Sequence, residues 1–211
     1  MTVAMRDVFI VGEDPVTRAV IYRLVKEYAP DLHIKHSLPA RGGEVKSKIA
    51  AFNQLAMAYP VILLADMDND PCPPVTKSNL LKNVRSISTE FVVNIAVDEA
   101  ETWLFADKVG FARYFDIPMD SMPESRLQKF QGMKARMEVD VPMKSSYFLT
   151  HFLIASSRSQ IFREQIGSSS SCKGKEYNSA ILPFISDSWD PEAARMNSYS
   201  LDKMIQRIQR L

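Results

Sequence analysis

Acidic side chains gather directly after three apolar segments of this chain. In the stretch LLADMDND, an apolar run is followed by three carboxylates within five residues, which is more than a turn needs. Carboxylates that lie close together raise one another's pKa unless a cation neutralises them. Hard divalent ions such as Mg²⁺ or Mn²⁺ prefer oxygen ligands and would suit such a group. The acids that follow the three segments are Glu13 and Asp14, then Asp66, Asp68 and Asp70, and then Asp98, Glu99 and Glu101.

The segments that must position these acids alternate between strand-like and helix-like patterns. Continuous apolar runs are typical of strands that are covered on both faces of a sheet. Such runs and apolar periodicity predict strands at 7–12, 32–38, 61–65 and 91–97, and helices at 16–29, 44–59 and 74–86, with another helix beginning at 99–107. This order predicts an α/β fold, in which a mainly parallel sheet is flanked by helices.

Ligands of open parallel sheets bind beyond the carboxyl ends of the strands. If the first and third predicted strands are neighbours, Glu13 meets Asp66 and Asp68 at that edge, and capping alone explains three carboxylates on two separate strands poorly. Asp14 stands before a proline and is expected to cap the following helix. Asp70 also precedes a proline and is expected to be a turn residue. The acids after the fourth strand could equally complement the dipole of the next helix.

The pattern changes in the second half of the chain. We expect an α/β domain at residues 1–118 and a helical extension packed on it at residues 119–211. A buried helix is predicted at 147–155, and an amphipathic helix is predicted at 200–211 with Ser200 as its N-cap. The serine- and glycine-rich stretch 167–174 is expected to be a loop.

Composition narrows the class of protein. The chain has 211 residues, of which 46% are hydrophobic and 24% charged, as in ordinary globular proteins, and no apolar run is long enough to cross a membrane. The N-terminus lacks the layout of a signal peptide, and two distant cysteines fit a reducing cytoplasm. Residues 1–120 hold 13 basic against 16 acidic residues, and residues 121–211 hold 13 against 9. This asymmetry fits an acidic metal site facing a basic region that could hold phosphates, and random surface charge explains it equally well.

The stretches VGEDPVTRAVIYRL, LLADMDND and VDEAETWLFAD together resemble the Toprim domain of primases, topoisomerases and overcoming-lysogenization-defect nucleases. That domain carries a Glu after its first strand and an Asp-x-Asp after its third, which on this sequence are Glu13, Asp66 and Asp68. The E-x-E-x-W-L pattern at 99–104 and the C-terminal stretch from GKEYNSAILPF onward are similar to a bacterial family of small stand-alone Toprim-like proteins, some of them encoded beside ATPases in phage-defence loci. Toprim sequences usually place Gly directly after the Glu, where this chain has Asp14.

The resemblance implies a Toprim-like, Rossmann-like sheet and a nuclease that hydrolyses phosphodiester bonds with Mg²⁺ or Mn²⁺. Its substrate would be DNA or RNA, with DNA favoured, and its partner would be an ABC- or AAA-type ATPase in phage defence. The lack of a long apolar run, noted above, predicts that no membrane is involved. The metal would neutralise a phosphate oxygen and activate water, and Glu13 would be a ligand or the general acid/base. The implied metal ligands are Glu13, Asp66, Asp68, Glu99 and Glu101, and the implied catalytic residues are Glu13, Asp66, Asp68 and Lys175. Lys173, Arg158 and Arg163 are further candidates for a cation near the developing charge.

Other classes of protein share parts of this pattern. A signalling receiver domain also ends its third strand with a functional Asp, but it places Ser or Thr after the fourth strand and Lys after a fifth. This chain has Asp98 and Glu99 after the fourth predicted strand, and it lacks a clear fifth strand. A non-catalytic Toprim-fold assembly subunit is the third alternative, since Asp14 departs from the Toprim pattern.

Overall fold

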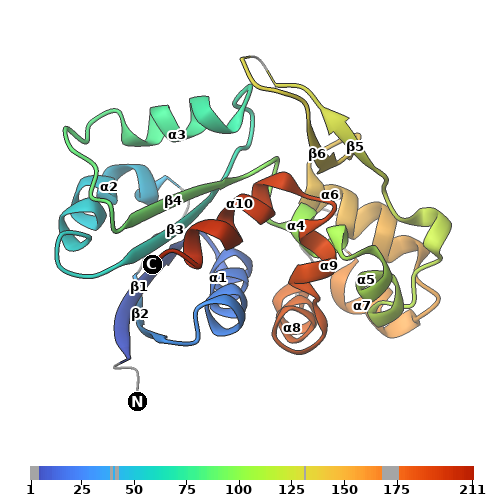
Figure 1. Cartoon of the computed structure of the whole chain (residues 1–211). Helices are drawn as coiled ribbons and strands as arrows, with labels where there is room; N and C mark the ends of the chain where they lie inside the picture. Colours follow the sequence, from blue (N-terminus) through green and yellow to red (C-terminus); the bar gives the residue numbers. More distant parts are fainter. Residues whose placement is uncertain (1–4, 39, 41–42, 131, 168–175) are drawn as a thin grey trace.

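A parallel four-stranded sheet forms the centre of the structure (Figure 1). The structure is a computed structural model that describes residues 5–38, 40, 43–130, 132–167 and 176–211. Within these residues the sheet has the order β2-β1-β3-β4, so the first and third strands are neighbours, as the site requires. The four predicted strands are confirmed as β1 (Arg6–Gly12), β2 (Leu32–Ser37), β3 (Val61–Asp66) and β4 (Phe91–Ala96).

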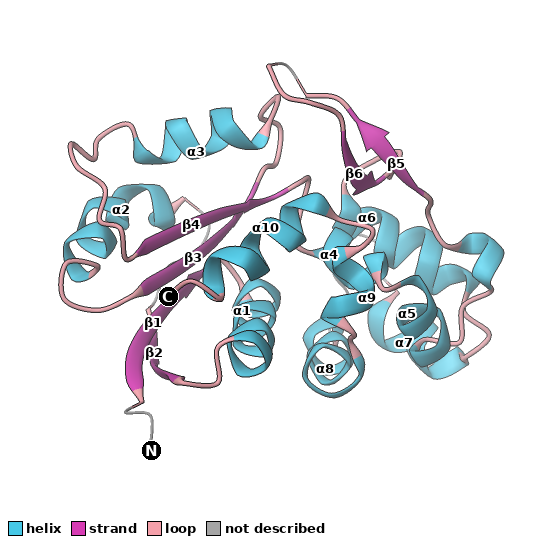
Figure 2. Ribbon diagram, in the orientation of Figure 1, coloured by secondary structure: helices cyan, strands magenta, loops and turns pink. Residues whose placement is uncertain are grey.

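Helices cover both faces of this sheet, because its strands are apolar on both sides (Figure 2). Alternation along β1 sends Val8 and Ile10 to one face and Phe9 and Val11 to the other. The first face packs against α1 (Pro15–Tyr28) and α10 (Tyr199–Ile208), and the second against α2 (Glu44–Leu55) and α3 (Pro73–Leu81). The predicted α/β class is therefore confirmed.

The second half of the chain is mostly helical and shares the core of the sheet. Its elements are α4 (Glu101–Ala106), α5 (Lys108–Tyr114), η1 (Met119–Ser121), β5 (Ser125–Gln128), β6 (Arg136–Val139), α6 (Ser145–Phe148), η2 (Leu149–Leu153), η3 (Ile154–Ser156), α7 (Gln160–Ile166), α8 (Tyr177–Pro183), η4 (Phe184–Ser188) and α9 (Pro191–Arg195). The expectation of a helical extension missed the antiparallel ribbon formed by β5 and β6. The fully buried Trp189 donates from Nε1 to the carbonyl of Trp103 at 3.2 Å, so one core crosses the predicted division near residue 118. That division stays a prediction.

The C-terminal helix begins two residues earlier than its sequence suggested. Its N-cap is Ser198, whose hydroxyl accepts from the backbone N–H of Leu201, so Ser200 as the N-cap was wrong. Ser200 is instead buried in the first turn, where its hydroxyl donates to Glu138. Most of the predicted loop at 167–174 lies outside the described residues. No helix in the described part of the chain combines the length and apolar character of a membrane span.

Candidate functional site

The loops that follow β3 and β4 are fastened to each other by backbone hydrogen bonds. The N–H of Met67 donates to the carbonyls of Ala96 and Asp98, each at 3.0 Å, and the N–H of Asp68 donates to the carbonyl of Asp98 at 3.2 Å. Asp68 and Asp98 adopt the left-handed backbone region, with φ of 50° and 60°. Aspartate enters this region more readily than most residues, and left-handed residues other than glycine cluster at functional sites. The two acidic loops therefore occupy one edge of the sheet.

Gly12 and Asp14 fix the position of Glu13 at the end of β1. A Cβ on Gly12 would lie only 2.6 Å from Thr17 Oγ1 and 2.9 Å from the backbone nitrogen of Arg18, so glycine lets the first turn of α1 come close. Asp14 caps α1 as predicted, because its Oδ1 accepts from the N–H of Thr17 at 2.8 Å. The φ of Asp14 is −141°, an extended conformation that does not require the glycine usual in Toprim sequences.

Glu13, Asp66 and Asp68 line one hollow of about 390 Å³ at this edge. Burial, reinforced by the charges of Asp68 and Asp14, raises the pKa of Glu13 to about 7. Burial likewise holds the pKa of Asp66 well above its usual range, and the neighbouring carboxylates raise it further. Asp66 Oδ1 accepts from the N–H of Ala100 at 2.9 Å. The predicted convergence of these carboxylates at one edge is therefore present, and their mutual repulsion favours a positive charge nearby.

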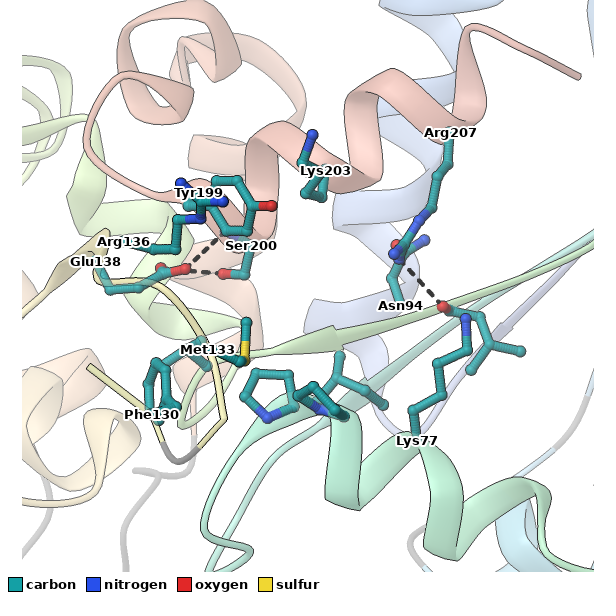
Figure 3. Close-up of a pocket in the computed structure, with 15 residues that line it drawn as sticks. Lys77, Asn94, Phe130, Met133, Arg136, Glu138, Tyr199, Ser200, Lys203 and Arg207 are labelled. Carbon is teal, nitrogen blue, oxygen red and sulfur yellow. Dashed lines mark hydrogen bonds between the residues drawn. The ribbon is translucent and has the colours of Figure 1, made fainter. Parts of the chain in front are cut away.

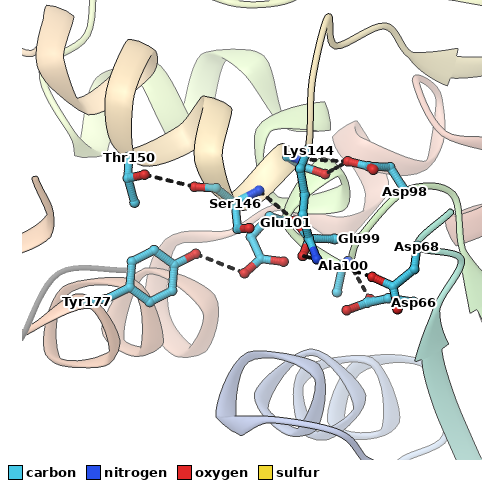
Figure 4. A network of polar contacts seen from close by, with 11 residues as sticks. Asp66, Asp68, Asp98, Glu99, Ala100, Glu101, Lys144, Ser146, Thr150 and Tyr177 are labelled. Atoms are coloured by element: carbon cyan, nitrogen blue, oxygen red, sulfur yellow. Dashed lines mark hydrogen bonds and ion pairs between the residues drawn. The ribbon is translucent and has the colours of Figure 1, made fainter. Parts of the chain in front are cut away.

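Lys144 provides such a positive charge in this structure (Figure 4). Its Nζ lies 3.2 Å from Asp68 Oδ1 and 3.1 Å from Glu99 Oε1, and it comes from the segment just before α6. Burial opposes the charged form of Lys144, but the hydrogen bonds to Glu99 and Asp68 raise its pKa above the ordinary value. Lys144 was not predicted from the sequence, in which its only signal is the excess of basic residues after residue 120.

The acids after β4 hold the second half of the chain against the sheet (Figure 4). The backbone N–H of Ser145 donates to Asp98 Oδ2 and that of Ser146 donates to Glu99 Oε2, each at 2.7 Å. The buried Glu101 accepts from the hydroxyl of Tyr177 at 3.0 Å through its Oε1. These contacts give Glu99 and Glu101 a structural role, and their role as metal ligands stays a prediction.

The basic side chains that the sequence suggested as catalytic cations do not lie beside the acids in the described part of the chain. Lys173 and Lys175 lie outside the described part of the chain. Arg163 donates from its guanidinium to the carbonyl of Ser157, and the exposed Arg158 follows η3. Among the described residues, neither arginine forms an ion pair with the acids that follow β1, β3 and β4. The catalytic role of Lys175 stays a prediction.

The side chains at this edge could serve as ligands of a hard divalent cation, because they are carboxylates that repel one another in a partly buried hollow. Among the described residues, however, no group of three His, Cys, Asp or Glu side chains is arranged so that it could hold a metal ion. The side chains of Asp68 and Glu99 are instead directed to Lys144. The chemistry of the residues thus fits the expected ion, while their present arrangement serves a lysine.

Comparisons of this chain with protein-family models, with curated proteins and with solved structures found no match. The fold and the site therefore define a structural class rather than a family. This is an α/β protein whose four-stranded parallel sheet is flanked by helices, an arrangement compatible with a Rossmann-like fold, and it carries carboxylates at the carboxyl edge of the sheet. Membership of the Toprim family stays a prediction.

Proposed function

We propose that this chain is a cytoplasmic, Mg²⁺- or Mn²⁺-dependent nuclease of the Toprim type. The observation that supports the proposal is the meeting of Glu13, Asp66 and Asp68 in one hollow, although they come from the ends of two neighbouring strands. This is the edge at which open α/β sheets bind their ligands. Capping accounts for Asp14 but not for these three residues.

Each residue has a distinct part in the proposal. Asp66 and Asp68 would hold the cation, which would supply charge neutralisation at a phosphate oxygen and an acidified water. Glu13 would be a further ligand or would hold the proton that leaves the attacking water. Lys46 also lines the hollow, and together with Lys144 it would attract and orient the phosphate backbone. The rest of the proposal, DNA rather than RNA as substrate and an ATPase partner in phage defence, depends on the Toprim resemblance alone.

The test is cleavage of plasmid DNA, linear DNA and RNA by the purified chain with Mg²⁺, with Mn²⁺ or with a chelator. Asp68→Asn should reduce the rate by about 100-fold or more, because a carboxylate ligand becomes a neutral amide. The side chain of Asp68 is 56% exposed, so this change should leave the fold intact. Glu13→Gln should have a similar effect.

Asp70→Asn is the matched control, because Asp70 lies on the same loop and lines the same hollow. It should keep the parent rate within about threefold, as a turn residue outside the chemistry. The proposal fails if the parent chain cleaves none of the three nucleic acids with either metal. It also fails if the Asp68 and Glu13 variants cleave as fast as the parent.

A non-catalytic role is the second candidate, and the contacts of Lys144 favour it. In that case the carboxylates fasten the second half of the chain through Lys144, Ser145 and Ser146, and the protein serves assembly. The two candidates differ in a cleavage-independent measurement, the binding of Mn²⁺ to the parent chain and to the Asp68→Asn variant. Binding that requires Asp68 supports the metal site, and equal or absent binding supports the assembly role.

A further inference from the structure

A second pocket lies along the free edge of β4, away from the carboxylates. It has a volume of about 250 Å³ and is bounded by β4, the start of α3, the β5–β6 ribbon and α10 (Figure 3). β4 is the last strand of the described sheet, so here helices and a ribbon border it in place of a fifth strand. The pocket is somewhat smaller than the roughly 300–1,000 Å³ typical of ligand sites, so it suits a small ligand.

Four cationic side chains surround this pocket: Lys77 of α3, Arg136 of β6, and Lys203 and Arg207 of α10. None of the four forms an ion pair with a carboxylate in the part of the chain that the structure describes. Figure 3 shows Lys77 and Arg207 approaching the same stretch of β4 from opposite sides. Burial lowers the pKa of Lys77, and the charge of Arg207 lowers it further. An anion between them would relieve this repulsion.

The buried side-chain amide of Asn94, in the pocket wall, has a hydrogen-bond donor without an acceptor among the described residues. Asn94 of β4 is only 1% exposed, and its Oδ1 accepts from the guanidinium of Arg207. Its Nδ2 is buried and has no hydrogen-bond partner among the residues that the structure describes. Buried polar atoms are rarely left without a partner, so an orphan donor beside unpaired cations indicates a missing acceptor. A phosphate oxygen would supply one.

The remaining lining suits a flat apolar group. The centroid of the Tyr199 ring lies 4.6 Å from the guanidinium carbon of Arg136 and 5.2 Å from Nζ of Lys203. Phe130 and Met133 line the pocket beside the ribbon, on the same side as Tyr199 and away from Lys77 (Figure 3). Aromatic and arginine faces of this kind are the usual partners of nucleobases. The pocket therefore has a cationic end and an aromatic end.

We propose that this pocket binds a nucleotide, with its phosphate near Lys77, Asn94 and Arg207 and its base against Tyr199 and Phe130. The nucleotide is either a free mononucleotide or the terminal nucleotide of a nucleic-acid strand, since both present a phosphate next to a base. The proposal is independent of the nuclease function, because none of these residues belongs to the carboxylate hollow.

The test is calorimetric titration of the full chain in the presence of EDTA, so that metal-dependent binding or cleavage plays no part. The probes are AMP, CMP, GMP and UMP, a short 5′-phosphorylated single-stranded DNA, adenosine and inorganic phosphate. At least one mononucleotide or the DNA should bind about tenfold tighter than adenosine or phosphate alone, because only these probes engage both ends of the pocket. Preference for the mononucleotides identifies a free nucleotide as the ligand, and preference for the DNA identifies a strand end.

Lys77→Gln should weaken that binding about tenfold, which is the loss of one charge-assisted contact. Lys82→Gln is the matched control, since Lys82 is an exposed lysine at the end of the same helix, and it should change the affinity by less than about twofold. The proposal is overturned if no mononucleotide and no DNA binds, if phosphate alone binds as tightly as the nucleotides, or if Lys77→Gln binds like the parent. Each of these results is independent of whether the chain cleaves nucleic acid with metal.

Discussion

Replacing Glu138 by glutamine should remove a pH dependence of stability that the buried carboxyl group imposes. Glu138 is 2% exposed and stands where β6 meets the start of α10. Its Oε1 accepts from the N–H of Ser200 at 2.7 Å, and its Oε2 accepts from the hydroxyls of Ser198 at 2.8 Å and Ser200 at 3.0 Å. Glutamine can keep all three contacts, because its oxygen can face the N–H while the two hydroxyls rotate to accept from its amide.

The size of this pH-dependent change in the free energy of unfolding follows from the pKa of Glu138. Burial, opposed by the hydrogen bonds from Ser198 and Ser200, raises the pKa of Glu138 from its ordinary 4.5 to about 7. Between these two values the folded chain holds a proton that the unfolded chain has released. The stabilisation is therefore complete below pH 4.5 and is lost as the pH rises through about 7. At about 1.36 kcal/mol for each pH unit, this window corresponds to about 3 kcal/mol in the free energy of unfolding.

Urea unfolding between pH 4.5 and 8, followed by the fluorescence of the buried Trp103 and Trp189, measures this effect. The difference in stability between the Glu138→Gln variant and the parent should change by about 3 kcal/mol in favour of the variant as the pH rises across the window. Glu124→Gln, at an exposed residue paired with Arg126, should follow the parent to within a few tenths of a kcal/mol. Parallel pH curves for the Glu138→Gln variant and the parent would refute the reasoning.

Two further substitutions test contacts elsewhere in the chain. Lys144→Gln should tighten the binding of Mn²⁺ about three- to tenfold in a titration, because a partly exposed positive charge no longer competes for the carboxylates, whereas the exposed Lys134→Gln should leave it unchanged. Unchanged affinity in the Lys144 variant would show that the lysine and the metal do not share a site. Gly110→Ala should destabilise the fold by about 2 kcal/mol in thermal or urea unfolding, since the added Cβ would overlap the carboxylate of Asp107, which accepts from the N–H groups of Gly110 and Asp190. A gain in stability, as expected of glycine to alanine in an ordinary helix, would contradict this.

The central sheet could be predicted because its sequence signals are local. The continuous apolar run at 61–65 became the strand β3, and Asp14 before Pro15 became the cap of α1. The convergence of Glu13 with Asp66 followed from one general property of parallel sheets, that their carboxyl ends share an edge. These features require no knowledge of distant parts of the chain.

The features that were missed depend on contacts between distant residues. Ser198 and Ser200 are equally good N-caps by type, and the choice between them coincides with the carboxylate of Glu138, about 60 residues earlier in the chain, which engages Ser200. The strands β5 and β6 have four residues each, with mixed polarity, so neither has the apolar pattern of a strand. Lys144 lies in a segment without periodicity, and only the folded chain brings it to Asp68.

Residues from the second half of the chain compensate the cost of burying carboxylates at this edge of the sheet. Eight acids follow β1, β3 and β4 at this edge of the sheet, and burying a carboxylate costs several kcal/mol unless hydrogen-bond donors or cations compensate. The compensation for the acids after β4 comes from later residues, since Ser145 donates to Asp98, Ser146 to Glu99 and Tyr177 to Glu101. Glu13, Asp66 and Asp68 thereby remain, together with the turn residue Asp70, as the acids that line the hollow, and Lys144 lies beside them as a partly exposed counter-charge. The extension is therefore part of the candidate site, because it determines which of the acids can serve a cation and which serve the fold.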